Sequence, residues 1–254
     1  MNVPDAACFA LLVHYDGAPF HGWQLQPDAP TVQGELERVL ARIHGGTRIP
    51  VTGSGRTDRG VHATGQVAAV ALPDPSGRWD APALRRSLNA LLPDSIWIEE
   101  VRRVPPSFHP RFDARRRSYR YRVGTSPRAR SPLHARGCWP TDPAPPDGAL
   151  LHAAATLLPG DRSFRAFARA GQEERGDRCH LMAAAWHPWQ EDAEGEILGW
   201  TFHVTANRYL HHMVRYLVGT MVAVARGERP LAELEALLDD PETDLVTSPP
   251  APAQ

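Results

Sequence analysis

Asp58 lies in a segment whose residue types suit a carboxylate that does chemistry. Arg56 and Arg59 flank it, and a nearby positive charge keeps a carboxylate ionised, as a nucleophile or a base requires. Glycines, which allow unusual backbone dihedrals and the close approach of a ligand, stand nearby at Gly53, Gly55 and Gly60. The same residues fit a tight hairpin whose aspartate caps the turn, and spacing alone favours that interpretation. A phosphate-binding loop is a weaker alternative, since neither GxxxxGK nor GxGxxG is present.

A second chemical feature is a run of arginines beside two tyrosines. Between positions 111 and 130 there are eight arginines and one acid, although the whole chain has a net charge of −1 and contains no lysine. Arg115, Arg116 and Arg117 precede an expected strand that carries Tyr119 and Tyr121. Because guanidinium groups neutralise phosphates and aromatic rings stack on bases, the segment favours contact with RNA. Without that function, the tyrosines would be half-buried packing residues and the arginines ordinary surface.

A third feature is the polar side of a long helix expected from about residue 208 to residue 226. Arg215 lies on this side, at i±4 spacing from His211 and Gly219, and a solvated face explains the arrangement as well as a functional one does. The adjacent pair His211 and His212 raises the question of a metal site. We expect none, because adjacent helical histidines point in different directions and no carboxylate or cysteine stands three or four residues further on.

Composition bounds the class of protein. The chain has 254 residues, of which 42% are hydrophobic and 22% charged, as in a folded protein with a substantial core. It contains no apolar run of about 18 residues, so we expect no membrane association, and residues 1–10 do not resemble a secretion signal. Three scattered cysteines, Cys8, Cys138 and Cys179, form neither a CxxC pair nor a disulfide framework. A reducing cytoplasm is the simplest location.

The elements that must position these residues follow from hydrophobic periodicity. In the first part of the chain we expect a helix over about 31–44 with Thr31 as its N-cap, and a second helix from Asp80 to about Leu91. Strands are expected over residues 8–14, 48–52, 66–72, 96–101 and 118–123. The Asp58 segment then lies in the turn between the second and third strands.

The second part of the chain repeats this style. We expect helices near 148–157 and 208–226, the latter ending before Gly227, and strands near 180–187 and 198–204. The expected domains are an N-terminal half, 1–125, a proline-rich crossing, 126–147, and a C-terminal half, 148–254, with an irregular tail from residue 248. The predicted fold class is α+β, with two similar halves and mainly antiparallel sheets.

The segment from Gly55 to Ala63 resembles the catalytic segment of the TruA family of tRNA pseudouridine synthases, which reads GRTDxGVHA. Five further stretches resemble family motifs, and all six follow the family's order. They are YDGxxFxGWQ at 15–24, LNxxLP at 88–93, FHARF at 108–112, YRY at 119–121 and NxFxHHMVRxxxG at 207–219. One such match has little weight, whereas six in order, spanning most of the chain, are highly specific.

The resemblance implies roles residue by residue. Asp58 matches the family's nucleophile, and Arg215 matches the basic residue that pairs with it. Tyr119 matches the tyrosine that packs on the target uracil and is a candidate for moving the C5 proton, and Arg56 matches the arginine implicated in base flipping. We expect further substrate contacts from Arg59, His62, Arg115, Arg116 and Arg117.

The implied activity is isomerisation of uridine to pseudouridine at positions 38, 39 and 40, in the anticodon stem-loop of tRNA. The resemblance also implies a homodimer, no cofactor, and the pseudouridine synthase fold, a ferredoxin-like or RRM-like duplication around a central active-site cleft. The reaction breaks the N-glycosidic bond, turns the uracil and rejoins it through C5, so the target base must be flipped out and held by stacking. Attack at uracil C6 and attack at ribose C1′ both remain open.

Two other functions are weaker alternatives. A non-catalytic RNA-binding module on the same fold has no need of Asp58, Tyr119 and Arg215. A small-molecule enzyme that uses the Arg-Asp loop on sugar phosphates leaves the arginine and tyrosine segment unexplained.

The family pattern continues beyond a proline-rich stretch into a final strand, whereas this chain stops at Gln254. The chain is therefore expected to be either naturally shorter or truncated, and whether the sheet is complete stays open.

Overall fold

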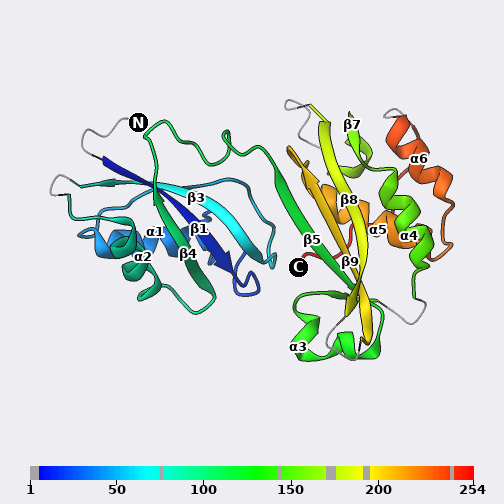
Figure 1. Ribbon diagram of the computed structural model, residues 1–254, viewed down its shortest axis with the longest axis horizontal. Helices are drawn as coiled ribbons and strands as arrows, with labels where there is room; N and C mark the ends of the chain where they lie inside the picture. The colour runs from blue at the N-terminus through cyan, green and yellow to red at the C-terminus, as the bar shows by residue number, and fades with distance from the viewer. Residues whose placement is uncertain (1–5, 75–76, 142–144, 170–175, 191–194, 241–242) are drawn as a thin grey trace. The chain divides into compact units, whose positions relative to one another are not determined.

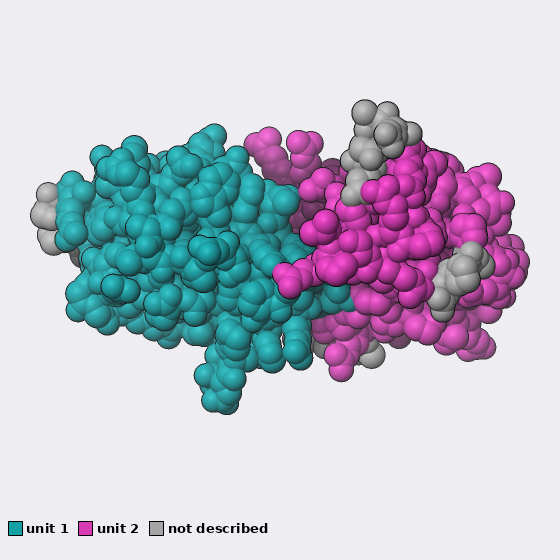
Figure 2. Space-filling view, turned by 90° about the horizontal axis from the view of Figure 1, so that it is seen from below, with its two compact units in different colours: residues 1–114, 253–254 teal, residues 115–252 magenta. Residues whose placement is uncertain are grey.

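The computed structural model describes residues 6–74, 77–141, 145–169, 176–190, 195–240 and 243–254. It divides into two compact units, unit 1 with residues 1–114 and 253–254, and unit 2 with residues 115–252 (Figure 2). Each unit has its own sheet and its own hydrophobic core, and the mixed α+β class predicted from the sequence is confirmed. The sequence-based halves placed the division near residue 125 instead. The structure places it before the strand at 117–124, because that strand pairs within the second sheet.

Unit 1 is a four-stranded antiparallel sheet with two helices on one face (Figure 1). The elements are β1 (Ala6–Tyr15), α1 (Val32–Ile43), β2 (Val51–Gly53), β3 (Ala63–Pro73), α2 (Ala81–Asn89) and β4 (Ile96–Arg103). This βαββαβ chain order and the sheet order β2-β3-β1-β4 are those of a ferredoxin-like unit. Alternate residues of β1 are buried, because successive side chains of a strand point to opposite faces.

Both helices of unit 1 begin where the sequence predicts. The side chain of Thr31 accepts a hydrogen bond from Gly34 N at 3.1 Å, and the side chain of Asp80 accepts one from Ala83 N at 2.6 Å. Each N-cap satisfies a backbone N–H that has no partner within its helix. The helices are therefore started locally and then held by their apolar faces against the sheet.

Unit 2 is a five-stranded sheet in the order β6-β5-β9-β8-β7, with helices packed on one face (Figure 1). The strands are β5 (Arg117–Gly124), β6 (Trp139–Pro140), β7 (Gly160–Ser163), β8 (Arg178–Gln190) and β9 (Ile197–Ala206). The helices are α3 (Pro132–Ala135), α4 (Gly148–Thr156), α5 (Met213–Ala225) and α6 (Leu231–Asp239). Only the short β5–β6 pair is parallel among the strand pairs described. The units share the plan of a sheet with helices on one face, but their strand orders differ.

Helix α5 forms the centre of the unit 2 core and differs from its predicted bounds. It begins at Met213 rather than near residue 208, because His212 takes a left-handed backbone with φ of 63° and Met213 N closes a turn onto Leu210 O. Its end agrees with the prediction, since Gly227 has φ of 71° and follows the C-cap. The tail from residue 248 is irregular, as expected, yet Ala251 within it is buried.

The sequence did not predict β6, β7, α3 or α6. Three of these are four residues long or shorter, too short to produce a periodic signal. Across the described parts of the chain, no helix combines the length and the apolar character needed to cross a bilayer.

Candidate active site

The loop that carries Asp58 connects β2 to β3 in unit 1, and a second loop holds it in place. Tyr15 Oη and Thr57 Oγ1 share a hydrogen bond of 2.8 Å. Trp23 N donates to Thr57 O at 3.1 Å, so the residue before Asp58 is held by both its side chain and its backbone. Tyr15 and Trp23 are buried and belong to the core of unit 1. The Asp58 backbone is therefore anchored to the core through its neighbour.

Two glycines let the loops approach this closely. A Cβ atom at Gly22, whose φ is +92°, would lie 2.5 Å from Thr57 O, and one at Gly17 would lie 2.1 Å from Val61 O. These distances are shorter than any real Cβ contact with a rigid backbone. The motif at 15–24 and the motif at 55–63 are thus two sides of one contact, which neither motif reveals by itself.

His62 also links the Asp58 loop to the turn that follows β1. Its Nδ1 atom accepts a hydrogen bond from Gly17 N at 3.2 Å and lies 3.1 Å from Asp16 Oδ1. The sequence placed His62 among the substrate contacts. In the structure its Nδ1 atom faces the turn at residues 16 and 17, which gives the side chain a part in holding the loop.

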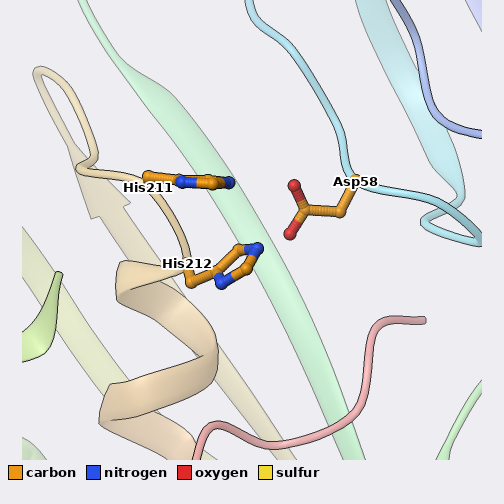
Figure 3. A group of neighbouring side chains, drawn as sticks. All are labelled: Asp58, His211 and His212. Atoms are coloured by element: carbon orange, nitrogen blue, oxygen red, sulfur yellow. The ribbon is translucent and has the colours of Figure 1, made fainter. Parts of the chain in front are cut away.

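The Asp58 side chain is partly buried, whereas Arg56 and Arg59 are exposed. The Asp58 carboxylate thus lies on an anchored loop that also carries two exposed arginines. Figure 3 shows the Asp58 side chain on its loop, and His211 and His212 in the segment that leads into α5. Asp58 belongs to unit 1, and the two histidines belong to unit 2.

The predicted site residues of unit 2 begin with Tyr119 on β5. Its ring meets the ring of Tyr209 edge to face, with centroids 4.9 Å apart. Tyr209 donates a hydrogen bond from its hydroxyl to Arg117 O at 3.2 Å, and burial of the phenol raises its pKa above the ordinary value. Sequence reasoning missed Tyr209, although it stands at the phenylalanine position of the motif at 207–219. Its hydroxyl makes a bond that phenylalanine could not.

The three arginines predicted to contact the substrate differ in their surroundings. Arg115 and Arg116 are exposed, whereas Arg117 is partly buried. Arg117 Nη1 donates to Asn207 O at 2.8 Å, and the Asn207 side chain accepts from His180 N at 2.9 Å. One donor of Arg117 is therefore used inside unit 2, where it holds the start of β5 against the end of β9.

Arg215 lies in the first turn of α5 and contacts the tail of the chain. Its Nε donates to Ala251 O at 2.6 Å, and Ala251 N donates to Arg215 O at 3.0 Å. Further along the helix, a Cβ atom at Gly219 would lie only 2.2 Å from Pro249 O. The alternative of a solvated face is wrong at Gly219, which is buried, because the tail covers this side of the helix.

His211 and His212 precede α5 instead of lying on it. Their ring centroids are 4.0 Å apart, so the expectation that the two side chains point in different directions is wrong. The cause is the left-handed backbone of His212, which turns the chain just before the helix begins. Arg169 N donates to His211 O at 3.1 Å and fixes this turn within unit 2.

Known proteins match this chain over most of its length. A family model described as tRNA pseudouridine synthase matches residues 11–113 and 154–254. The chain is 39% identical over 230 residues to tRNA pseudouridine synthase A of Chlorobium luteolum, covering 90% of this chain and 85% of that protein. It is 41% identical over 218 residues to the same-named protein of Chlorobaculum tepidum, covering 85% and 81%. With that of Geobacillus kaustophilus it shares 36% identity over 245 residues, covering 96% and 89%.

Proposed function

The chain belongs to the tRNA pseudouridine synthase family, and we propose that Asp58 is the nucleophile with which it isomerises uridine in the anticodon stem-loop, at positions 38, 39 and 40. As a member of this family it is an isomerase that acts on tRNA. One observation carries the proposal. The partly buried Asp58 lies on a loop that Tyr15 and Trp23 hold through hydrogen bonds to Thr57.

The reaction is faster when the attacking carboxylate is held in position than when it is mobile. Asp58 attacks either uracil C6 or ribose C1′, and in both cases the base must leave its stack before it can react. Anchoring Thr57 through Tyr15 and Trp23 limits the positions that the carboxylate can take, which lowers the entropic cost of reaching the reacting atom. Arg56, exposed two residues before Asp58, is proposed to contact the flipped nucleotide.

Two residues of unit 2 are also proposed to act in the reaction. Tyr119 offers a ring face for the flipped uracil and a hydroxyl for moving the C5 proton, and Tyr209 supports that ring from its edge. Arg215, held by Ala251 O through its Nε, is proposed to pair with Asp58 through its other donors. The exposed Arg115 and Arg116 are proposed to add general affinity for the phosphates of tRNA.

We also propose that the protein acts as a homodimer in the cytoplasm. A tRNA is large beside a single subunit of 28.0 kDa, and a two-fold assembly would offer it a longer basic surface. The three cysteines are free thiols, which suits a reducing compartment.

The test is Asp58→Asn, which removes the negative charge while nearly keeping the shape of the side chain. We expect pseudouridine formation to vanish and tRNA binding to persist, because the loop's anchors are untouched. Asp28→Asn, at an exposed acid elsewhere in unit 1, is the matched control and should turn over like the wild type. The readouts are nucleotide-resolution pseudouridine mapping and the tRNA dissociation constant. Substantial turnover by Asp58→Asn sinks the assignment, and binding without turnover by the wild type would favour a non-catalytic RNA-binding module.

A further inference from the structure

The sheet of unit 2 has an outer face, opposite α4, α5 and α6, that gathers basic side chains from three strands. Arg120 and Arg122 lie on β5, His203 on β9 and His187 on β8, and all four are exposed. Their neighbours along β5, such as Tyr121 and Val123, point the other way into the core. The outer face is thus set by the pleat of the strands.

The strand register brings these four residues together. Arg120 pairs directly with His203 across β5 and β9. In the next row, Thr201 of β9 pairs with Arg122 on one side and with His187 on the other. Residues opposite each other in neighbouring strands lie about 5 Å apart, so the two rows form one patch. The rings of His187 and His203 are in edge contact, with centroids 5.1 Å apart.

Positive charge dominates this patch. Burial, and then the adjacent His187, Arg120 and Arg122, lower the pKa of His203. Burial and the charge of Arg120 likewise lower the pKa of Arg122. Ala185 and Thr201, which complete these two rows, are uncharged, and so are Ser118 and Thr205 in the next row. The two rows thus bring two arginines and two histidines together, which gives this face a basic character.

Packing holds part of the patch in a fixed arrangement. The Arg122 guanidinium lies over the Trp189 ring, 5.0 Å from its centroid, and Trp189 is buried. Ser118 Oγ and Thr205 Oγ1 share a hydrogen bond of 2.8 Å beside Arg120. The face thus combines a guanidinium packed on a ring with an exposed one, next to hydroxyl and imidazole groups that also suit phosphate oxygens.

We propose that this face, built of Arg120, Arg122, His187 and His203, binds the phosphate backbone of the tRNA substrate. The inference rests on the proposed function and adds a contact surface separate from the Asp58 loop and from Arg115 and Arg116. Charge complementarity decides the partner, because RNA offers a regular row of negative charges. A second copy of this chain seated two-fold on the same face would bring like charges together, which disfavours that occupant.

The experiment uses the full-length protein with the variant Arg120→Gln/His203→Gln, both of whose sites are exposed. We expect its tRNA dissociation constant to rise about tenfold at physiological salt, and the slope of log Kd against log [KCl] to fall by about one for a lost phosphate contact. Pseudouridine formation at saturating tRNA should stay near the wild-type rate. Arg86→Gln, at an exposed arginine on α2, is the control and should leave affinity and slope unchanged.

Further variants separate charge from folding. Arg120→Lys keeps the charge and should keep the salt slope, and circular dichroism should show the same thermal unfolding for all of these proteins. An unchanged affinity and slope in the double variant overturns the inference, and so does a change in its sedimentation coefficient, since that would make the face an interface between copies. Pseudouridine formation by the wild type tests the proposed function separately from the proposed tRNA contact on this face. If the wild type makes pseudouridine but the double variant binds normally, only this inference fails.

Discussion

At the scale of single residues, Gly17 and Gly22 decide how closely the segment at 15–24 can approach the Asp58 loop. Both are contacted by loop backbone, which cannot move aside as a flexible side chain can. The loop's function therefore depends on the absence of two Cβ atoms, although neither glycine carries any chemistry.

Gly22→Ala should damage turnover more than binding. The added Cβ would lie 2.5 Å from Thr57 O, and the φ of +92° is strained for alanine, so we expect a loss of about 1 kcal/mol or more of stability. Because Thr57 precedes Asp58, kcat should fall while the Kd for tRNA changes little. Gly65→Ala, whose Cβ would meet no atom closer than 3.9 Å, is the control. Wild-type kcat in Gly22→Ala would show that the loop contact does not position Asp58.

Tyr209→Phe should reveal the buried phenol through its pH dependence. The variant keeps the edge contact with Tyr119 and loses the hydrogen bond to Arg117 O, at a cost of about 1 kcal/mol. Burial raises the folded pKa of Tyr209, so the unfolded chain ionises first. The stability that the Tyr209 hydroxyl contributes to the folded chain is fully present below the unfolded tyrosine pKa of about 10. It is lost as the pH rises above that value.

The measurement is urea unfolding of wild type and Tyr209→Phe at pH 8 and at rising pH. We expect the stability difference to narrow once the pH passes about 10. A difference that stays constant across this range would mean that the hydroxyl is not the group that titrates.

At the scale of elements, α5 depends on a segment that has no secondary structure of its own. The tail lies against the helix through two hydrogen bonds between Arg215 and Ala251, and the Tyr121 hydroxyl donates to Pro252 O at 2.7 Å. The glycine in the motif at 207–219 has its explanation here, since Gly219 leaves room for Pro249 O. The tail is thus part of the structure that holds Arg215.

Gly219→Ala should have opposite effects with and without the tail. In an exposed helix alanine is favoured over glycine by about 1 kcal/mol. With the tail in place, the new Cβ would lie 2.2 Å from Pro249 O, so the variant should be less stable than wild type and lower in kcat. In a chain that lacks residues 249–254, the same substitution should stabilise. The measurement is thermal unfolding of a double-mutant cycle of four proteins, which are the wild type and Gly219→Ala, each with and without residues 249–254. A change in stability of the same sign with and without the tail would contradict the contact.

At the scale of the whole molecule, the residues proposed to act in the reaction are divided between the two units. Asp58, Arg56 and Arg59 belong to unit 1, whereas Tyr119 and Arg215 belong to unit 2. The units have separate cores, so a core substitution in one need not disturb the side chains of the other. Variants can therefore be assigned to the unit in which they act.

Sedimentation should find the protein as a dimer of the 28.0 kDa chain at micromolar concentration. A dimer would present tRNA with two copies of the basic residues, so affinity should fall as dilution favours the monomer. The measurement is sedimentation equilibrium combined with turnover over the same range of concentration. A monomer with full activity at every concentration would refute the dimer.

The sequence by itself determined the features that depend on neighbours along the chain. A short apolar run located β1, helical spacing located α1 and strict alternation located β9. The caps Thr31 and Asp80 marked helix starts, because all of these signals arise within a few residues. The resemblance of the segment around Asp58 was also local. Short elements such as β7 and α3 have no period to detect, and α5 was drawn too long because apolar spacing continues through the turn at His212.

Only the tertiary structure decided which distant segments meet. Gly22, which lies between β1 and α1, packs against Thr57 in the β2–β3 loop. Ala251 of the tail forms hydrogen bonds with Arg215 of α5. The basic patch arises because the register of β5, β9 and β8 aligns residues that are far apart in sequence. The physical reason is that a one-residue shift in register turns every side chain of a strand to the other face. The sequence names the arginines and histidines, but only strand pairing selects those that share a surface.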